Sequence, residues 1–265
     1  MMIDSHCHLA GEEFAADLEA VVDRAKGADV SGALCILAAG DQPESDAAAR
    51  LRQLWPAVTF SVGVHPHTAA KAGSADEAAA LVRRSVETER AVAIGEIGLD
   101  YHYDFSPRDV QARIFEAQVA LAVDLDRPVI IHTREATDDT FAVLKDTGAG
   151  KVRGVFHCFT GDVAMARRAL DIGFYVSLSG IVTFPRAEEL RRVAAMVPAD
   201  RLLIETDAPY LAPVPFRGKR NEPAFVARVA EAIAIARGTD PAAVADATTR
   251  NFAAFLGPTV SLPTA

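Results

Sequence analysis

The sequence predicts an α/β fold, a single-domain TIM-type (β/α)8 barrel. Short apolar runs alternate with longer helical patterns along all 265 residues, which is typical of repeated βα units around a parallel sheet. Eight such runs are present, the number of strands that closes this type of barrel. Histidines and acidic residues recur where several runs end, and closure would bring those ends to one mouth. The chain length also falls in the range of such barrels.

The eight predicted strands are short, and helical or turn segments separate them. They cover residues 2–6, 32–38, 58–64, 91–95, 128–132, 154–158, 174–179 and 202–206. An open doubly wound sheet is the alternative, but neither G-x-G-x-x-G nor a phosphate-binding loop follows the first run. The ends of many strands lie in a row in an open sheet and converge in a barrel. The spread of ligand-type residues over five strands therefore favours the barrel.

Helices are predicted between the strands and after the last one. Residues 12–28, 109–125 and 162–173 carry apolar side chains at three- and four-residue steps, as amphipathic helices do. Two further helices are predicted to begin near Pro223 and Pro241, because proline is well tolerated in a first helical turn. We assign residues 1–258 to one barrel domain and 259–265 to a C-terminal tail.

Composition and charge restrict the function classes. Hydrophobic residues make up 50% of the chain and charged residues 24%, which is enough apolar material for one core. The formal net charge of −9 excludes a broad basic face that would hold nucleic acid by counterion release alone. Metal ions, a few arginines and the short basic run at 217–220 would have to attract any phosphate-bearing substrate.

The N-terminus and the cysteines bear on location. Neither a positively charged N-terminal segment nor a long apolar stretch is present, so we expect no signal peptide, no membrane partner and a cytoplasmic protein. The three cysteines, Cys7, Cys35 and Cys158, are interpreted as buried small thiols, not as metal ligands or a disulfide.

Six side chains form a candidate metal site. His6 and His8 are two residues apart in the first strand, where alternation places both imidazoles on one face. The other four follow or end later apolar runs, and they are Glu96, His132, His157 and Asp207. Imidazole nitrogens and carboxylate oxygens are ligands that divalent cations share in proteins. The pattern therefore predicts a metal-dependent enzyme.

Each of these residues also has an ordinary structural explanation. Glu96 would be a buried salt bridge, although an apolar strand buries a carboxylate at considerable cost. His132 and His157 would be core histidines with backbone partners, and Asp207 would cap the turn ahead of Pro209. Their recurrence at the ends of separate strands favours metal ligation over these alternatives.

Further residues are candidates for contact with substrate. His65 ends the third predicted strand, and Arg134 lies two residues after His132, where its planar guanidinium would face a phosphate. Tyr101 follows Glu96 in the same segment and is a candidate for ordering that loop and binding substrate. His67 and His102 are predicted to be loop or surface residues.

The motifs together resemble those of one known family. The chain resembles the TatD family of metal-dependent deoxyribonucleases, within the amidohydrolase-like barrel superfamily, over nearly its full length. The matching segments, in family order, are DSHCHL, GVHPH, GEIGLDYHYDFSP, PVIIHTREA, HCFTG, SLSGIVTFP, ETDAPYLAP and GKRNEP. One departure is Ala10, where family members commonly carry an acidic residue. This position is not an expected ligand.

The resemblance implies a site with two divalent metal ions, Zn, Mn or Mg, and hydrolysis of phosphodiester bonds in DNA, often as a 3′-to-5′ exonuclease. We expect Glu96 to bridge the two ions and Asp207 to accept a proton from the attacking water, which makes these two the catalytic residues. The expected ligands are His6, His8 and Asp207 for one ion and His132 and His157 for the other. His65 and Arg134 would hold the scissile phosphate.

Two other functions remain open at this point. The first is a barrel hydrolase acting on a small ester, lactone or amide, since fold does not determine chemistry. The second is a metal-stabilised binding or quality-control protein that is not an enzyme. The expected partner is DNA or a short nucleic acid, and the sequence indicates neither the oligomeric state nor a preference for DNA over RNA.

Overall fold

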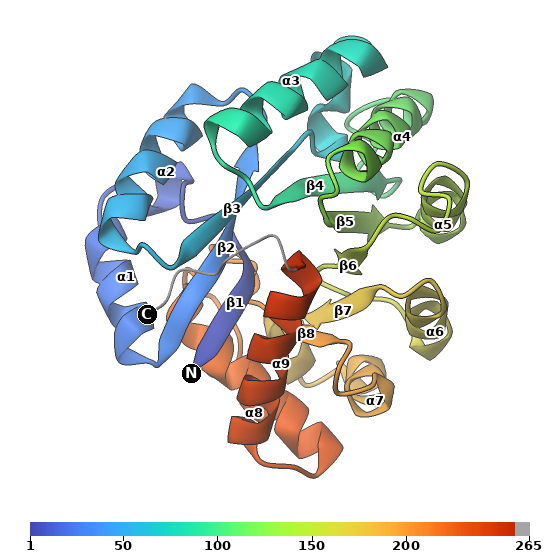
Figure 1. The fold of residues 1–265 in the computed structure, drawn as a ribbon. Helices are drawn as coiled ribbons and strands as arrows, with labels where there is room; N and C mark the ends of the chain where they lie inside the picture. The colour runs from blue at the N-terminus through green and yellow to red at the C-terminus, as the bar shows by residue number, and fades with distance from the viewer. Residues whose placement is uncertain (258–265) are drawn as a thin grey trace.

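The computed structural model of the protein describes residues 1–257 and shows a barrel of eight parallel strands (Figure 1). Neighbouring strands pair in chain order from β1 to β8, and a parallel bridge between Cys7 and Ala208 joins the two ends of the sheet. The predicted fold class is therefore confirmed. The predicted tail, 259–265, lies outside the described residues.

Each strand overlaps its predicted position. The strands are Met2–Cys7 (β1), Val30–Ala38 (β2), Val58–Gly63 (β3), Ala93–Asp100 (β4), Val129–Arg134 (β5), Gly154–Phe156 (β6), Tyr175–Leu178 (β7) and Leu202–Ile204 (β8). The largest difference is at β4, which runs five residues beyond its predicted end at 95. This extension forms because β4 keeps pairing with β5 as far as Asp100 and Arg134.

The helices surround the strands. They are Leu18–Gly27 (α1), Gln42–Leu54 (α2), Ala75–Thr88 (α3), Arg108–Asp124 (α4), Thr137–Asp146 (α5), Val163–Asp171 (α6), Glu188–Met196 (α7), Val226–Arg237 (α8) and Pro241–Leu256 (α9). Short 3-10 helices cover Glu12–Phe14 (η1), Pro66–Lys71 (η2), Gly180–Thr183 (η3) and Pro223–Phe225 (η4).

The single helix predicted over 12–28 is wrong in one respect, because it is split into η1 and α1. Arg220 donates to the carbonyl oxygen of Glu13 at 2.5 Å, an acceptor that a continuous helix would offer to the N–H of Asp17. That N–H bonds instead to Phe14, three residues back. The interaction with a distant arginine therefore ends the first turn.

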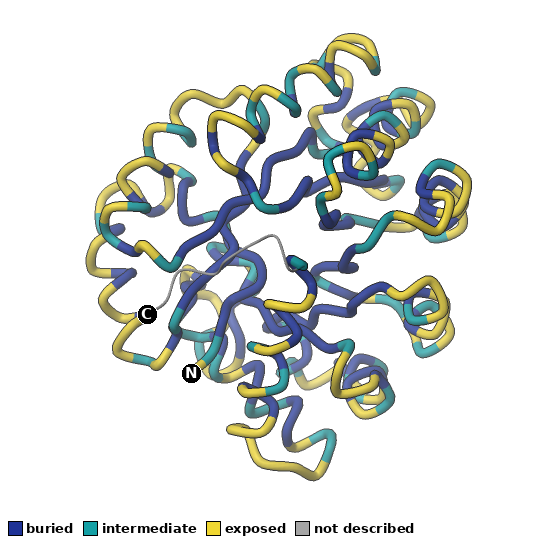
Figure 2. The backbone as a smooth tube through the Cα atoms, viewed as in Figure 1, coloured by how far each residue is buried: buried dark blue, intermediate teal, exposed yellow. Residues whose placement is uncertain are grey.

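The core has an inner and an outer part. In Figure 2 the strands are mostly dark blue, the colour of buried residues, and the outer turns of the helices are yellow. The outer part lies between the strands and the helices, whose exposed faces point outward. The inner part is built from early residues of the strands, such as Ile3, Ala93 and Leu203, and it packs against Phe252 and Phe255 of α9. Helix α9 thus closes the amino-terminal end of the barrel. Among residues 1–257, none of the helices combines the length and hydropathy needed to cross a bilayer.

Candidate metal centre

The seam between β1 and β8 positions the first group of side chains. The N–H of Asp207 donates to the carbonyl oxygen of His6 at 2.9 Å, and the N–H of His8 donates to that of Ala208 at 2.7 Å. Below these bonds, the buried carboxylate of Asp4 accepts from the Thr206 N–H at 2.9 Å and from its hydroxyl at 2.5 Å. Backbone pairing at the seam therefore holds His6, His8 and Asp207 together.

Irregular pairing in two strands turns His6 and Glu96 toward the mouth, the carboxyl-terminal end of the barrel. Ile3 and Ala93 face the barrel interior, and regular alternation would turn residues three positions later to the outside. The register shifts between Asp4 and Cys7 in β1 and between Ile94 and Ile97 in β4. A bulge of this kind redirects the side chains that follow it.

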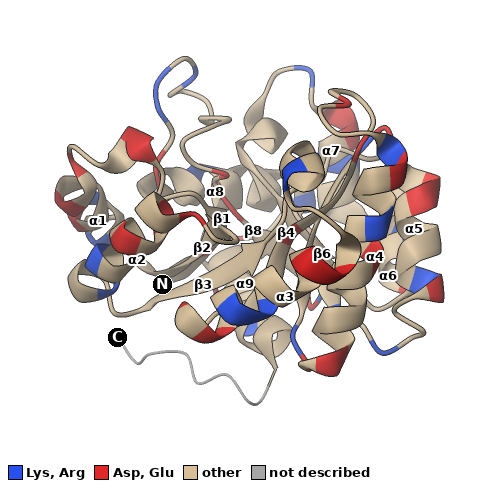
Figure 3. Cartoon of the chain, turned by 90° about the horizontal axis from the view of Figure 1, so that it is seen from above, with Lys and Arg blue, Asp and Glu red and all other residues tan. Residues whose placement is uncertain are grey.

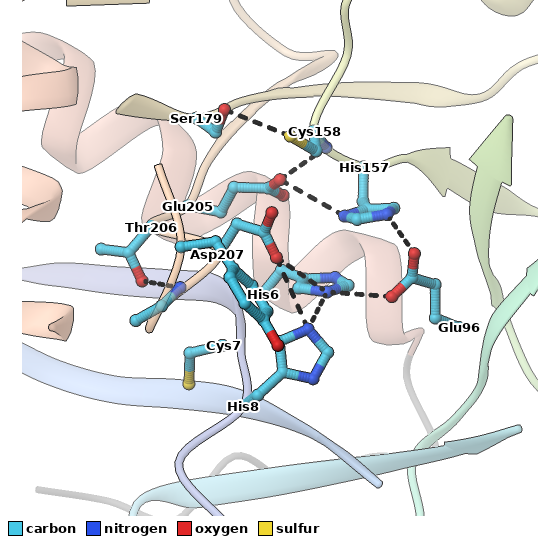
Figure 4. Close-up of polar contacts among 12 residues, drawn as sticks. His6, Cys7, His8, Glu96, His157, Cys158, Ser179, Glu205, Thr206 and Asp207 are labelled. Atoms are coloured by element: carbon cyan, nitrogen blue, oxygen red, sulfur yellow. Dashed lines mark hydrogen bonds and ion pairs between the residues drawn. The ribbon is translucent and has the colours of Figure 1, made fainter. Parts of the chain in front are cut away.

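The first half of the cluster contains two histidines and two carboxylates (Figure 4). The Nε2 atoms of His6 and His8 lie 3.3 Å apart. Asp207 Oδ1 lies 3.7 Å from His6 Nε2 and 3.5 Å from His8 Nε2. Glu96 Oε2 lies 3.5 Å from His6 Nε2. Two imidazole nitrogens and two carboxylate oxygens thus surround one small volume.

The second half is built on the other oxygen of the same glutamate. Glu96 Oε1 lies 2.7 Å from His132 Nδ1 and 2.7 Å from His157 Nε2. The rings of His6 and His157 stack with centroids 3.9 Å apart, so the two halves are in contact. Glu96 is therefore shared between two groups of imidazoles, and Figure 4 shows its contacts with both His6 and His157.

The donor set fits divalent cations. His6, His8 and Glu96 place one donor atom each within 4.8 Å of one another, and so do Glu96, His132 and His157. The two facing Nε2 atoms of His6 and His8 would both use their lone pairs on a cation between them. The far nitrogen of His132, Nε2, lies 2.9 Å from Asp100 Oδ2, and such carboxylate partners orient metal-binding histidines in known sites.

The electrostatics of the cluster keep its carboxylates anionic. Burial alone would raise the pKa of Glu96, but the adjacent His157 and His65 and hydrogen bonds from the imidazoles hold that pKa well below its ordinary value. The pKa of Asp207 is also lowered, since His8 and His6 outweigh its burial. Burial lowers the pKa of His6, which keeps its imidazole neutral. The carboxylates outweigh burial and raise the pKa of His8, His132 and His157, so a cation would bind there in exchange for protons. Anionic oxygens and a neutral nitrogen are the forms that bind a metal.

The structure also places the predicted substrate-contacting residues. His65 Nε2 lies 3.3 Å from Glu96 Oε1, at the cluster itself. The guanidinium of Arg134 lies over the ring of Tyr103 at 4.8 Å, and Arg134 lines a cavity of about 300 Å³ that also contacts His157. Tyr101 differs, because its hydroxyl donates to Asp139 of α5 at 2.7 Å. Within the described residues, it makes no side-chain hydrogen bond to any of the six cluster residues. Substrate contact by these three residues stays a prediction.

Three polar residues at the centre, His67, Asp100 and Glu205, were not among the predicted ligands or substrate contacts. His67, predicted to be a loop or surface residue, is half-buried, and its Nε2 lies 2.9 Å from Asp100 Oδ2. That oxygen also contacts His132. Glu205 is fully buried and accepts the N–H of Cys158 at 2.5 Å. The two-residue spacing of Glu205 from Asp207 was a sequence signal for Glu205. Asp100 would have been found if β4 had been predicted to extend that far.

Two other predictions concern residues around the centre. His102 lies at the surface as expected, with Nδ1 2.7 Å from the exposed Glu135. All three cysteines are free thiols, and Cys7 and Cys35 are buried as predicted. Cys158 is partly exposed instead, with Sγ 3.3 Å from Ser179 Oγ, because it follows β6 in the loop that lines the cavity.

Known proteins share this sequence and fold. Residues 3–257 match the family model of the TatD related DNases. The chain is 42% identical over 251 residues to the "uncharacterized metal-dependent hydrolase YabD" of Bacillus subtilis, covering 95% of this chain and 97% of that protein. It is 39% identical over 256 residues to the "3'-5' ssDNA/RNA exonuclease TatD" of Erwinia tasmaniensis, covering 94% and 97%. The crystal structure of YJJV, a TatD homolog from Escherichia coli, covers 97% of this chain and 98% of its own, with a TM-score of 0.87 at 30% identity. The chain therefore belongs to the TatD family of metal-dependent hydrolases.

Proposed function

We propose that this protein hydrolyses phosphodiester bonds of single-stranded DNA or RNA from the 3′ end, with two divalent cations bound around Glu96. The observation that carries this proposal is that the two carboxylate oxygens of Glu96 face separate groups of imidazoles. The name of the Erwinia tasmaniensis relative, a 3'-5' ssDNA/RNA exonuclease, supports the substrate class and the polarity. Its extensive coverage supports transfer of this activity to the present chain.

The ligand assignment is part of this proposal. His6, His8 and Asp207 would hold one cation, His132 and His157 the other, and Glu96 both. When bound, two such cations lower the pKa of a water and offset charge on the phosphate. A mixed set of imidazoles and carboxylates suits zinc or manganese, and magnesium binds where substrate oxygens complete its coordination.

The residues of the chain would perform the remaining steps. Asp207 stays ionised because its pKa is lowered, so its carboxylate is available to accept a proton from the attacking water. His65 lies against Glu96 and would donate a hydrogen bond to the scissile phosphate. Within residues 1–257, none of the carboxylates forms an ion pair with Arg134, whose guanidinium is therefore free for a second phosphate oxygen.

The test is a nuclease assay with single-stranded oligonucleotides that carry a label at the 5′ or the 3′ end. Protein loaded with zinc, manganese or magnesium is expected to release a labelled mononucleotide first from the 3′-labelled oligonucleotide. Glu96→Gln should lower the rate by more than about 100-fold, the upper range for removing an outer partner of a metal ligand. The matched control is Glu87→Gln, which removes an exposed carboxylate near the end of α3 and should keep the rate.

Two outcomes would contradict the proposal. Full activity in Glu96→Gln would exclude the shared carboxylate. Absence of nuclease activity with every metal, together with hydrolysis of a lactone or small ester in a parallel panel, would assign the protein to the small-molecule hydrolases instead.

A further inference from the structure

Exposed aromatic side chains gather at the metal centre. Within residues 1–257, the largely exposed aromatic residues are Tyr103, Phe105 and Tyr210, at 48%, 66% and 55%. The rings of Tyr103 and Phe105 lie 5.4 Å and 4.9 Å from that of His67. The ring centroids of Tyr210 and His8 lie 6.1 Å apart. All three therefore border the candidate site, although exposed aromatic rings gain nothing from core packing.

Tyr103 and Phe105 form a flat platform, which we call the aromatic shelf. Their rings stack with centroids 5.2 Å apart and planes 16° apart, on the loop between β4 and α4. The guanidinium of Arg134 lies over the Tyr103 ring at 4.8 Å. Phe105 is the more exposed of the two residues, so its ring is the part of the shelf most open to a ligand.

The shelf and Tyr210 lie on different sides of the cluster. From the shelf, contacts run through His67 to Asp100 and His132. From Tyr210, they run through His8 to Asp207. Glu96 lies between the two series, since it contacts both His132 and His6. A strand whose phosphate lies at Glu96 would thus pass an aromatic ring on either side.

The charge of the molecule makes these rings important for binding. The net charge is −9, and Figure 3 shows acidic and basic residues interspersed along the outer helices. Neutralising many phosphates is how basic proteins hold nucleic acid. That contribution is small here, so stacking of bases on aromatic rings would have to supply affinity.

We propose that the aromatic shelf stacks an unpaired base of the nucleic-acid substrate, and that Tyr210 stacks a second base across the metal centre. This inference rests on the proposed function, because it takes single-stranded nucleic acid as the ligand. A base must leave its own helical stack to lie on Phe105, which costs least in a single strand. The shelf therefore selects single strands over duplexes, and it tolerates any sequence because every base has a stacking face.

The experiment compares two labelled oligonucleotides with the same backbone, one carrying thymine at every position and the other abasic. Both carry phosphorothioate linkages to slow cleavage, and Kd is measured by fluorescence anisotropy with manganese at fixed salt. Wild type should bind the thymine strand more tightly. Phe105→Ala should weaken that binding by about 5- to 150-fold, the range for one stacked base, and reduce the ratio between the two strands. Tyr210→Ala should reduce it too.

Further variants separate stacking from apolar contact and from loss of fold. Phe105→Trp should keep the affinity ratio, whereas Phe105→Leu, which keeps apolar area but has no ring, should reduce it. Ile235→Ala removes an exposed apolar side chain on α8 and should leave binding unchanged. Circular dichroism and thermal unfolding of each variant show that the fold is intact.

The outcomes separate this inference from the proposed function. Base-dependent binding that falls in Phe105→Ala supports the shelf even where wild type hydrolyses no oligonucleotide, a result that would contradict only the nuclease activity. Equal binding of the two strands by wild type, or an unchanged ratio in Phe105→Ala, overturns the shelf whatever the nuclease assay shows. Equal affinity of Phe105→Leu and wild type also overturns stacking, because an aliphatic contact would then suffice.

Discussion

At Glu96, the position of one carboxylate depends on the backbone around it. Gly98, two residues later, has a φ of +147°, a conformation that other residues rarely adopt. A Cβ added to Gly98 would lie 1.9 Å from the carbonyl oxygen of His132. The small residue therefore allows β4 to approach β5 closely beside the candidate metal centre, at the pairing of Gly98 with His132.

Gly98→Ala is expected to destabilise the protein by about 1–3 kcal/mol or more, because the added methyl group forces β4 and β5 apart. Activity should fall as well, since Glu96 and His132 would move relative to each other. The matched control is Gly27→Ala, where a Cβ meets nothing within 4 Å and helix propensity favours alanine. Urea unfolding followed by circular dichroism measures the stability of both variants, and the nuclease assay measures their activity. Equal stability of Gly98→Ala and wild type would show that this close approach is unimportant.

At the scale of residues, the six candidate ligands chosen from the sequence do come together in the structure, for particular reasons. His132 lies in β5 and His157 directly follows β6, and both strands are regular, so alternation from Ile130 and Val155 in the inner core turns both histidines to the mouth. His6 and Glu96 face the same way only because of register shifts, which depend on pairing between distant strands. The contacts of Asp100 with His132 and of Glu205 with the Cys158 backbone were not predicted, because no local pattern encodes them.

At the scale of elements, α9 is tied to the barrel by a polar contact as well as by its aromatic residues. The side-chain amide of Asn251 donates to the carbonyl oxygens of Ala199 at 2.7 Å and Leu202 at 2.8 Å. These acceptors lie just before and at the start of β8, the strand that closes the sheet. The helix therefore supports β8 from below, at the end opposite the candidate site.

Asn251→Ala should lower the free energy of unfolding by about 1–3 kcal/mol, because two carbonyl oxygens lose their donor, with a small offset from the better helix propensity of alanine. Thr249→Ala on the same helix removes only an exposed contact with the carbonyl oxygen of Met1, and a change within about 0.5 kcal/mol is expected. Chemical denaturation measures both variants. Similar values for the two would show that Asn251 does not anchor α9.

At the scale of the whole molecule, the positions of helices and strands could be predicted from hydrophobic periodicity. The point at which a helix is interrupted could not. The eight strands were predicted in order because buried parallel strands are continuous apolar runs. The division of 12–28 into η1 and α1 depends on Arg220, which is remote in the chain. Local patterns could not contain that contact.

Cation binding should stabilise the entire barrel. The cluster draws side chains from β1, β4 and β5 and from the residues after β6 and β8, and an unfolded chain cannot gather them. At a free cation concentration of 100 times Kd, the gain would be about 2.7 kcal/mol, or about 5–10 °C in Tm for a chain of this size. Differential scanning calorimetry with manganese, and with a chelator, measures the difference. Glu96→Gln should lose most of it, and an equal shift in that variant would place the cations elsewhere.

The contact between Asp4 and Thr206 joins residues 202 positions apart, and it has a consequence for protein synthesis. While the ribosome is still making the second half of the chain, His6 and His8 have emerged but Asp207 has not. A nascent polypeptide therefore carries an incomplete set of these candidate ligands and leaves the edge of its first strand unpaired until the eighth arrives. The six side chains therefore come together only when the eighth strand has joined the first.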